Sequence, residues 1–185
     1  MKRLLRLITL TLICGFFMAV VPQAHAISYK FTSIDYQGAW ETYAHGINDN
    51  EQIVGDYYDF TGVHGFLLSE GIYSSINHPS TSSGRTVATG INNNEDIVGR
   101  YQRGSSIVGF LLSGGIYTDI QYPGAGPTIP EDINNKGQVV GWYLGKEGTR
   151  GFLLSEGIYT TIDYFGAYQT QTHGINDNGQ IVGFA

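Results

Sequence analysis

A ten-residue pattern that occurs four times constrains what this 185-residue chain can fold into. Each copy begins with glycine or aspartate, followed by isoleucine, asparagine, several mostly polar residues, an apolar pair and a final glycine. The copies lie at residues 46–55, 90–99, 132–141 and 174–183, and their isoleucines are 44, 42 and 42 residues apart. A fixed period of this length is typical of repeat architectures, in which each unit buries its apolar face only by stacking on its neighbours.

The pattern predicts a strand, a tight turn and a second strand. Asn and Asp bond their own backbone and tolerate left-handed conformations, so they favour the turn. Gly137 and Gly179 provide a positive φ at little cost in two copies. The other two copies have Glu51 and Glu95 instead, and there we expect an asparagine to take the left-handed position. The final glycine lies inside the second strand, which predicts that another backbone or side chain comes close to it.

The rest of each unit predicts two more strands. Gly-Phe-Leu-Leu-Ser occurs at residues 65–69, 109–113 and 151–155, and each is followed by a Gly-Ile-Tyr turn and strand. Four antiparallel strands in 42 to 44 residues are typical of a β-propeller blade. The sequence therefore predicts an all-β, propeller-like array of four-stranded antiparallel blades. The alternative is a β-solenoid, whose coils are usually shorter and seldom contain three hairpins.

A count of the predicted strands leaves the array incomplete. We expect a single repeat domain over residues 27–185, with an N-terminal strand at 28–36, units at about 46–89, 90–131 and 132–173, and a partial unit at 174–185. This arrangement gives 15 strands, and the last unit lacks the Gly-Phe-Leu strand. Unpaired strand edges favour pairing with another chain, so self-association through open edges is expected. A truncated remnant of a longer repeat protein is the alternative.

Residues 1–26 have the features of a secretory signal peptide. Lys2, Arg3 and Arg6 precede an apolar run from Leu7 to Val21, and Ala24-His25-Ala26 is a small-x-small cleavage site. The run is shorter than the ~20 residues that span a membrane. We therefore expect secretion, to the extracellular space or the periplasm, after cleavage near Ala26, and no stable membrane insertion of the mature chain.

The expected mature chain is acidic. Removal of the three basic residues of the signal peptide leaves seven of the ten basic residues against sixteen acidic ones, a net charge of −9. An acidic surface without a basic cluster argues against nucleic acid as a partner. The one cysteine of the sequence, Cys14, lies in the signal peptide, so we expect no disulfide.

The repeats resemble the HAF-type extracellular repeat of bacterial secreted proteins. The resemblance rests on Gly-Ile-Asn-x-x-Gly-x-Ile-Val-Gly-x-Tyr, on Gly-Phe-Leu, and on an Ile-Asp-Tyr-x-Gly-Ala segment that is found at residues 34–39 and 162–167. The His-Ala-Phe signature of the family is matched in part at one place, His64-Gly65-Phe66. The resemblance implies export and a propeller-like fold, and it implies no particular activity.

No catalytic constellation is recognisable in the sequence. It lacks a Gly-x-Ser-x-Gly elbow, a His-Glu-x-x-His motif and Cys/His metal spacing, so we expect no metal and no cofactor. His45 and His173 occupy equivalent positions before Gly-Ile-Asn, where they line a shared pocket or simply begin a strand. Trp40 and Tyr168 follow Gly-Ala at equivalent positions, where they bind a ligand or pack between blades.

These features favour a secreted, non-enzymatic binding scaffold whose loops contact an extracellular polysaccharide or a cell-surface protein. A second hypothesis is a hydrolase or lyase with its site at the propeller centre, which requires acidic residues and histidines to converge there. The third hypothesis is the truncated structural remnant.

Overall fold

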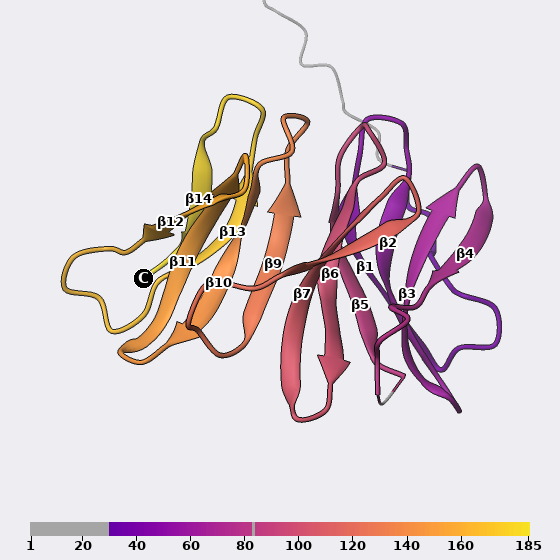
Figure 1. Cartoon of the computed structure of the whole chain (residues 1–185). Helices are drawn as coiled ribbons and strands as arrows, with labels where there is room; N and C mark the ends of the chain where they lie inside the picture. Colours follow the sequence, from indigo (N-terminus) through magenta and orange to yellow (C-terminus); the bar gives the residue numbers. More distant parts are fainter. Residues whose placement is uncertain (1–29, 83) are drawn as a thin grey trace, which may run out of the picture. The chain divides into compact units, whose positions relative to one another are not determined.

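The structure is a computed structural model that describes residues 30–82 and 84–185. In these residues it contains 14 strands and no helix, and the strands form antiparallel sheets (Figure 1). The predicted all-β, propeller-like array of four-stranded antiparallel blades is confirmed. The expected signal peptide lies outside the described residues. A search of the described residues finds no helix that is long and apolar enough to cross a membrane.

The sheets follow the order of the chain, and we call them blades 1 to 4. Blade 1 consists of β1 (Glu41–Ile47), β2 (Ile53–Asp59), β3 (Gly62–Ser69) and β4 (Ile72–Ile76). Blade 2 consists of β5 (Thr86–Ile91), β6 (Ile97–Arg103), β7 (Ser106–Ser113) and β8 (Ile116–Ile120). Blade 3 consists of β9 (Thr128–Ile133), β10 (Val139–Gly145), β11 (Gly148–Ser155) and β12 (Ile158–Ile162). Blade 4 has two strands, β13 (Gln171–Ile175) and β14 (Ile181–Phe184).

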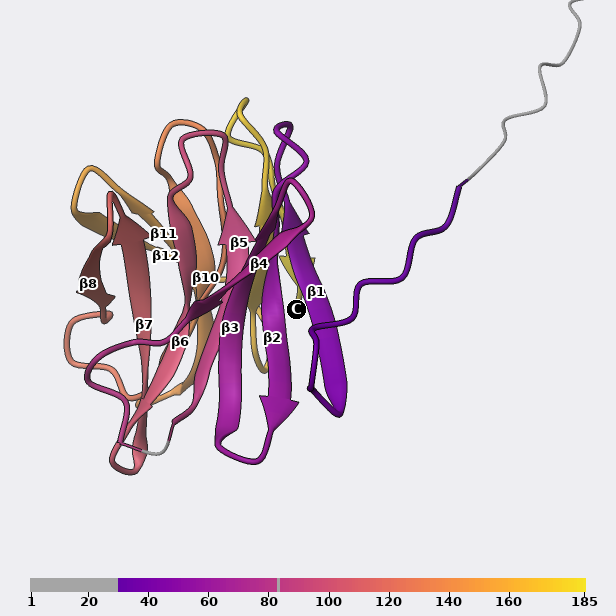
Figure 2. The same ribbon diagram turned by 90° about the vertical axis from the view of Figure 1, so that its right-hand side faces the viewer.

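Within each blade every strand pairs with its neighbours in the chain, so the connections inside a blade are hairpins. Figure 2 shows β1, β2 and β3 of blade 1 side by side. The first strand of each blade begins several residues before the repeated pattern. Ser33–Ala185 form one compact unit.

The recurring glycine of the second strand makes room for the core of the blade. Gly99 is paired with Phe110 of the neighbouring strand, and the Phe110 side chain is fully buried. A Cβ atom at Gly99 would overlap the carbonyl oxygen of Val87 and lie 2.8 Å from the Phe110 ring. The same pairing joins Gly55 to Phe66 and Gly141 to Phe152. The predicted close approach is therefore confirmed.

Glutamate takes the left-handed position in the first two turns, so our expectation of an asparagine there is wrong. Glu51 has a φ of 60° and Glu95 a φ of 64°, close to the 74° and 76° of Gly137 and Gly179. The reason is the asparagine that begins the turn. The Oδ1 atom of Asn48 accepts hydrogen bonds from the amides of residues 50 and 52. These bonds fix the turn around Asn48 and leave the left-handed φ to Glu51, two residues before β2.

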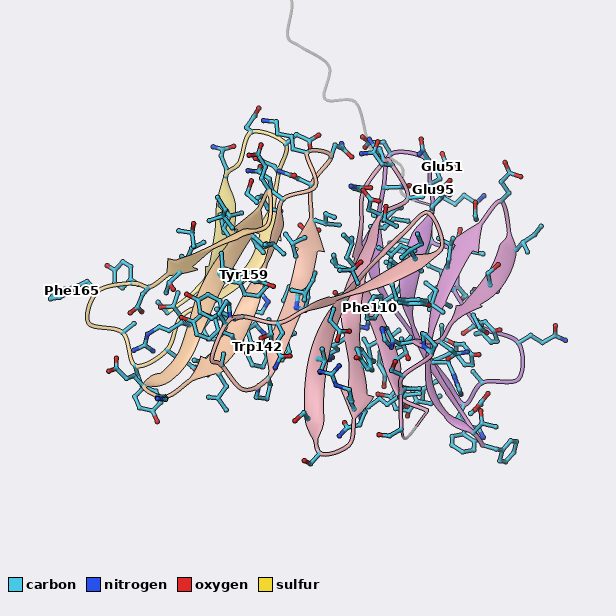
Figure 3. The ribbon with its side chains drawn as sticks, viewed as in Figure 1. Glu51, Glu95, Phe110, Trp142, Tyr159 and Phe165 are labelled. Atoms are coloured by element: carbon cyan, nitrogen blue, oxygen red, sulfur yellow. The ribbon has the colours of Figure 1, made fainter. Side chains whose placement is uncertain are left out.

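These turns also join one blade to the next. The Nδ2 atom of Asn48 donates to the carbonyl of Asn92 at 2.9 Å, that of Asn92 to Asn134 at 3.1 Å, and that of Asn134 to Asn176 at 3.0 Å. We call this series the turn ladder. Glu51 and Glu95 are labelled at this end of the molecule in Figure 3. The ladder joins blades 1 to 4 because Asn48, Asn92 and Asn134 each bond both their own turn and the following one.

The predicted N-terminal strand at 28–36 is not formed in its described part, and that prediction is wrong. Residues 30–36 carry no strand, and the Phe31 side chain is 93% exposed. A fourth strand of this repeat pairs with a third strand, and the third strands of the described chain, β3, β7 and β11, already pair with β4, β8 and β12. Tyr36 instead stacks on Tyr57 of β2, with ring centroids 3.7 Å apart.

Candidate functional site

The complete blades share a three-residue contact near the end opposite to the turn ladder, which we call the rim triad. An aromatic residue of the connection that enters the blade stacks on a tyrosine of the second strand. A polar residue of the fourth strand lies beside their polar atoms. The triads are Tyr36, Tyr57 and Ser75 in blade 1, His78, Tyr101 and Asp119 in blade 2, and Tyr122, Tyr143 and Thr161 in blade 3. The stacked rings lie 3.7, 3.6 and 3.7 Å apart.

The connections are held in place in the same way in each blade. A threonine hydroxyl at the start of the next strand accepts a hydrogen bond from the amide of the stacked residue. In blade 3 this bond runs from the Tyr122 amide to Thr128 Oγ1 at 3.0 Å. Gly124, with a φ of 73°, makes the turn that returns the chain to β9. The fold therefore fixes the position of the rim triad in each complete blade, whereas the side chains around the triad differ from blade to blade.

Blade 3 has a pocket beside its triad. Its volume is about 380 Å³, and it lies between the connection at 122–125, the turn between β10 and β11, and the end of β12. We call it the rim pocket. Its lining residues are Tyr122, Pro123, Gly124, Ala125, Tyr143, Gly145, Lys146, Glu147, Gly148, Arg150, Thr161 and Asp163.

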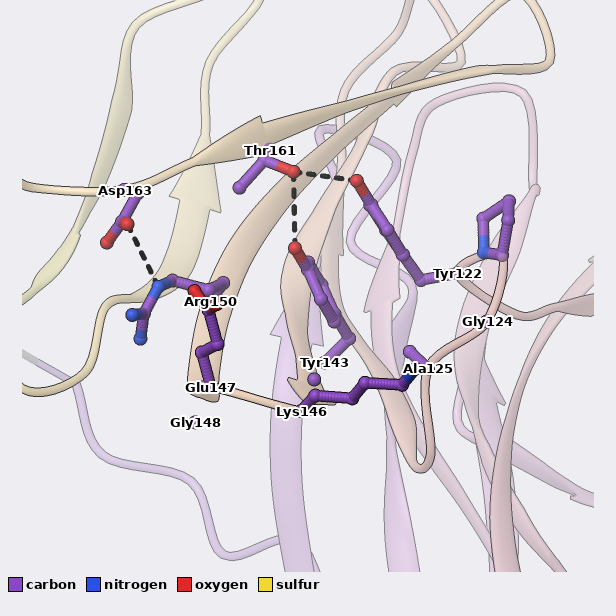
Figure 4. Close-up of a pocket in the computed structure, with 12 residues that line it drawn as sticks. Tyr122, Gly124, Ala125, Tyr143, Lys146, Glu147, Gly148, Arg150, Thr161 and Asp163 are labelled. Atoms are coloured by element: carbon purple, nitrogen blue, oxygen red, sulfur yellow. Dashed lines mark hydrogen bonds and ion pairs between the residues drawn. The ribbon is translucent and has the colours of Figure 1, made fainter.

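The polar groups of the rim pocket point toward one another (Figure 4). Thr161 Oγ1 lies 2.6 Å from the Tyr122 hydroxyl and 3.2 Å from the Tyr143 hydroxyl. Arg150 Nε lies 2.9 Å from a carboxylate oxygen of Asp163. Burial, above all, raises the pKa of the Tyr143 phenol. The phenol therefore stays protonated and able to donate a hydrogen bond at neutral pH.

The tip of the turn adds a second pair of charges. Lys146 and Glu147 are both exposed. In the part of the chain that the structure describes, neither forms an ion pair within 4.0 Å. Figure 4 shows the Lys146 side chain extended toward Ala125, along one side of the pocket. The rim pocket thus contains two cations and two carboxylates, of which one cation and one carboxylate form no ion pair within the described residues.

The polar side chains around the triad differ in the other blades. In blade 1 His64 replaces Arg150, and its ring nitrogens lie 2.7 Å from Thr61 Oγ1 and 2.7 Å from Asn77 Oδ1. In blade 2 Arg103 forms an ion pair of 2.7 Å with Asp119, the triad residue itself. The side chains around the rim triad therefore vary between blades, whereas the triad itself is formed in all three complete blades.

His78 of blade 2 is a buried histidine near a carboxylate, but its equivalents are tyrosines in the same stack. We therefore assign it a packing role. Its side chain is 5% exposed and stacks on Tyr101. Burial, as the largest cause, lowers the pKa of His78, and Arg103 acts in the same direction while Asp119 opposes it.

This shift predicts a pH dependence of stability. The unfolded chain takes up a proton at His78 as the pH falls through about 6.5, whereas the folded chain does so only at lower pH. The contribution of His78 to folding stability is therefore fully present above pH 6.5, and it is lost as the pH falls from there through the lower pKa of the folded chain. We expect His78→Tyr to reduce this loss. Urea denaturation of both proteins at pH 7.5 and 5.0 measures it, and an equal loss in the two proteins would contradict the assignment.

The predicted histidines are in different hairpins. His45 and His173 are the bulged residues of β1 and β13, where the strand register shifts, and a bulge re-aims a side chain. His45 Nε2 lies 2.5 Å from an oxygen of the buried Asp56, and His173 stacks on Phe184. Each contacts its own hairpin, and neither lines the cavity of about 270 Å³ beside the turn ladder.

The predicted aromatic positions are exposed. The Trp40 side chain is 62% exposed and meets Phe60 edge-on, with ring centroids 5.1 Å apart. Tyr168 is 94% exposed and lines a separate cavity after β12. The structure places the two residues at the entrances to blade 1 and blade 4, and they share no cavity there. Within the described residues no group of three or more His, Cys, Asp or Glu side chains is arranged to hold a metal ion.

The charged residues of the rim pocket are not among those predicted from the sequence. Lys146, Glu147, Arg150 and Asp163 are scattered over 18 positions and form no motif. The sequence nevertheless contains an indication of them, because the residue types at these positions differ between repeats whose strand and turn residues agree. An alignment of the complete repeats, position by position, shows that these four residues are not shared.

No family model matches the chain, and no curated protein matches it. Among solved structures the chain resembles one described as a streptogramin B lyase structure, with 14% sequence identity and a TM-score of 0.47. The match covers 79% of this chain and 55% of that one, so the chain spans about half the length of the structure it matches.

The prediction of a non-enzymatic scaffold for a polysaccharide or a cell-surface protein is wrong as it stands. The solved structure that resembles the chain is that of an enzyme, a lyase. We do not retain the prediction. The likeness concerns the fold and assigns no activity to this chain.

Proposed function

We propose that the rim pocket of blade 3 binds a small zwitterion, such as a free amino acid. The observation that carries the proposal is a 380 Å³ cavity lined by side chains of both charges and by two tyrosine hydroxyls. Ligand pockets of a few hundred Å³ typically combine apolar walls with a few polar groups that fix the ligand orientation. Here Tyr122 and Ala125 belong to the wall, and the charged side chains stand at its edge.

The charges of the pocket suit a ligand that has both signs. Lys146 and Arg150 offer ammonium and guanidinium donors to a carboxylate. Glu147 and Asp163 offer oxygens to an ammonium group. A ligand with one charge only would face two residues of its own sign, and like charges in contact oppose binding. A zwitterion avoids this cost because each of its charged groups faces an opposite charge.

We further propose that the protein acts outside the cytoplasm as an exported repeat protein of the HAF type. The basic start, apolar run and small-x-small site of residues 1–26 support export, and the repeat pattern supports the family. Such a protein would meet free amino acids or their derivatives as solutes of its surroundings.

A ligand screen with matched variants tests the binding proposal. Thermal unfolding is recorded with each common amino acid, and the strongest ligand is titrated by calorimetry. We expect Arg150→Ala to weaken binding about tenfold or more, because a hydrogen bond to a charged group contributes about 1.5–3 kcal/mol. Arg103→Ala serves as the control, since it removes the exposed arginine of blade 2, and it should leave binding unchanged. Failure of every amino acid to raise the unfolding temperature, or equal binding by both variants, would refute the proposal.

A further inference from the structure

Blade 4 exposes side chains whose equivalents in the complete blades are buried or partly buried. Val182 of β14 is 66% exposed, whereas the equivalent Val54, Val98 and Val140 are fully buried. Tyr164 holds the position of the stacked aromatic of the rim triad, and it is 70% exposed. The two strands pair antiparallel, with a bulge at His173 like the bulge in the first hairpin of each complete blade. The hairpin itself is therefore formed, and one face and one edge of it have no partner in the described residues.

The complete blades show which residues cover the equivalent surface. In each of them the second strand pairs with a Gly-Phe-Leu-Leu-Ser strand in one register. The strand glycine is opposite phenylalanine and the preceding valine is opposite leucine, as in Gly141 with Phe152 and Val140 with Leu153. Applied to β14, the same register places a phenylalanine opposite Gly183 and a leucine opposite Val182.

A cavity lies where that phenylalanine would pack. Its volume is about 370 Å³, and Ile162 and Ile181 are among its lining residues, together with Tyr164 and Val182. One repeat earlier, the equivalents of Ile162 and Ile181 are Ile120 and Val139, and these belong to the buried cluster that contains Phe152. The walls of the cavity therefore match the surroundings of a third-strand phenylalanine.

We propose that β14 binds an extended polypeptide segment of the Gly-Phe-Leu-Leu-Ser type. The segment adds to blade 4 as an antiparallel third strand, with its phenylalanine in the cavity over Gly183. Main-chain hydrogen bonds along the open edge provide affinity, and the pocket for the phenylalanine provides specificity, as in other complexes formed by strand addition. The blades of this chain serve as the template, so the chemistry of the partner follows from the molecule itself.

A labelled peptide tests this proposal. The probe is the segment 150–156, Arg-Gly-Phe-Leu-Leu-Ser-Glu, with a fluorophore at its N-terminus, and fluorescence anisotropy reports binding to the purified protein. We expect saturable binding that weakens at least tenfold when alanine replaces phenylalanine in the peptide. We also expect Val182→Glu in the protein to weaken binding at least tenfold. The exposure of Val182 makes this variant compatible with folding, which cooperative urea unfolding verifies.

The control is Leu144→Glu, which changes an apolar residue of 46% exposure on blade 3 and should leave peptide binding unchanged. Equal binding of the phenylalanine and alanine peptides would overturn the proposal, and so would unchanged binding by Val182→Glu. Light scattering adds a further outcome. If the protein forms a dimer that Val182→Glu dissociates, while the peptide neither binds nor competes, β14 pairs with its own copy and the proposed occupant is wrong.

Discussion

Gly99→Val is expected to destabilise the protein by about 3 kcal/mol or more. Gly99 lies in the middle of β6, and its missing side chain is the space that the Phe110 ring and the Val87 carbonyl occupy. Overpacking of a core typically costs 1–3 kcal/mol, and here one of the two obstacles is backbone, which moves only with its strand. Urea denaturation of the two proteins measures the difference in the free energy of unfolding.

Gly126→Ala is the matched control for this prediction. A Cβ atom at Gly126 would meet its nearest neighbour, the carbonyl oxygen of Leu144, at an ordinary 3.4 Å, and the equivalent positions 40 and 168 already carry large side chains. Its free energy of unfolding should stay within about 0.5 kcal/mol of the original protein. A Gly99→Val protein of unchanged stability would show that the blades are not packed as described.

Asn92→Ala is expected to cost about 2–4 kcal/mol, because the buried Asn92 side chain makes four hydrogen bonds. Its Oδ1 atom accepts from the amides of Asn94 and Asp96 at 2.9 and 3.0 Å. Its Nδ2 atom donates to Asp96 Oδ2 at 3.0 Å and to the carbonyl of Asn134 at 3.1 Å. Removal of one partner leaves buried groups without a hydrogen bond, at about 1–3 kcal/mol for each.

Asn176→Ala separates the turn from the ladder. Asn176 makes the same bonds inside its own turn, to the amides of residues 178 and 180 and to the Gln180 side chain. It is exposed and donates to no further blade in the described chain. We therefore expect a smaller loss of stability than for Asn92→Ala. Equal losses would mean that the turn ladder contributes nothing to the packing of one blade on the next.

The fold was predictable because the residues that define it recur. Gly99 and Phe110 have equivalents in every complete unit, and the Ile-Asn turn occurs four times, so the period reveals strand number, strand direction and blade order. Two local predictions were wrong for physical reasons. Glu51 takes the left-handed φ because Asn48, which begins the turn, is held by hydrogen bonds from the amides of residues 50 and 52. Residues 30–36 stay outside a sheet because each third strand in the described chain already pairs with the fourth strand of its own blade.

The candidate site was less predictable because it consists of the residues that do not recur. Arg150, for example, has His64 and Val108 as its counterparts. A search for a motif that all repeats share does not detect such a position. Only the structure shows that the turn at 145–148, the connection at 122–125 and the end of β12 meet around one cavity. By contrast, His45 and His173 do recur, and their equivalence reflects a β-bulge rather than a shared pocket.

The most direct measurement for the ligand proposal is a map of amide chemical shifts during titration with the amino acid that binds best. We predict that the resonances of residues 122–125 and 145–150, together with Thr161 and Asp163, move with a single saturation curve. The corresponding residues of blade 2, at 103–106, should not move. Shifts that are confined to the turn ladder or to blade 4, or an unchanged spectrum at saturating ligand, would contradict a zwitterion site in the rim pocket.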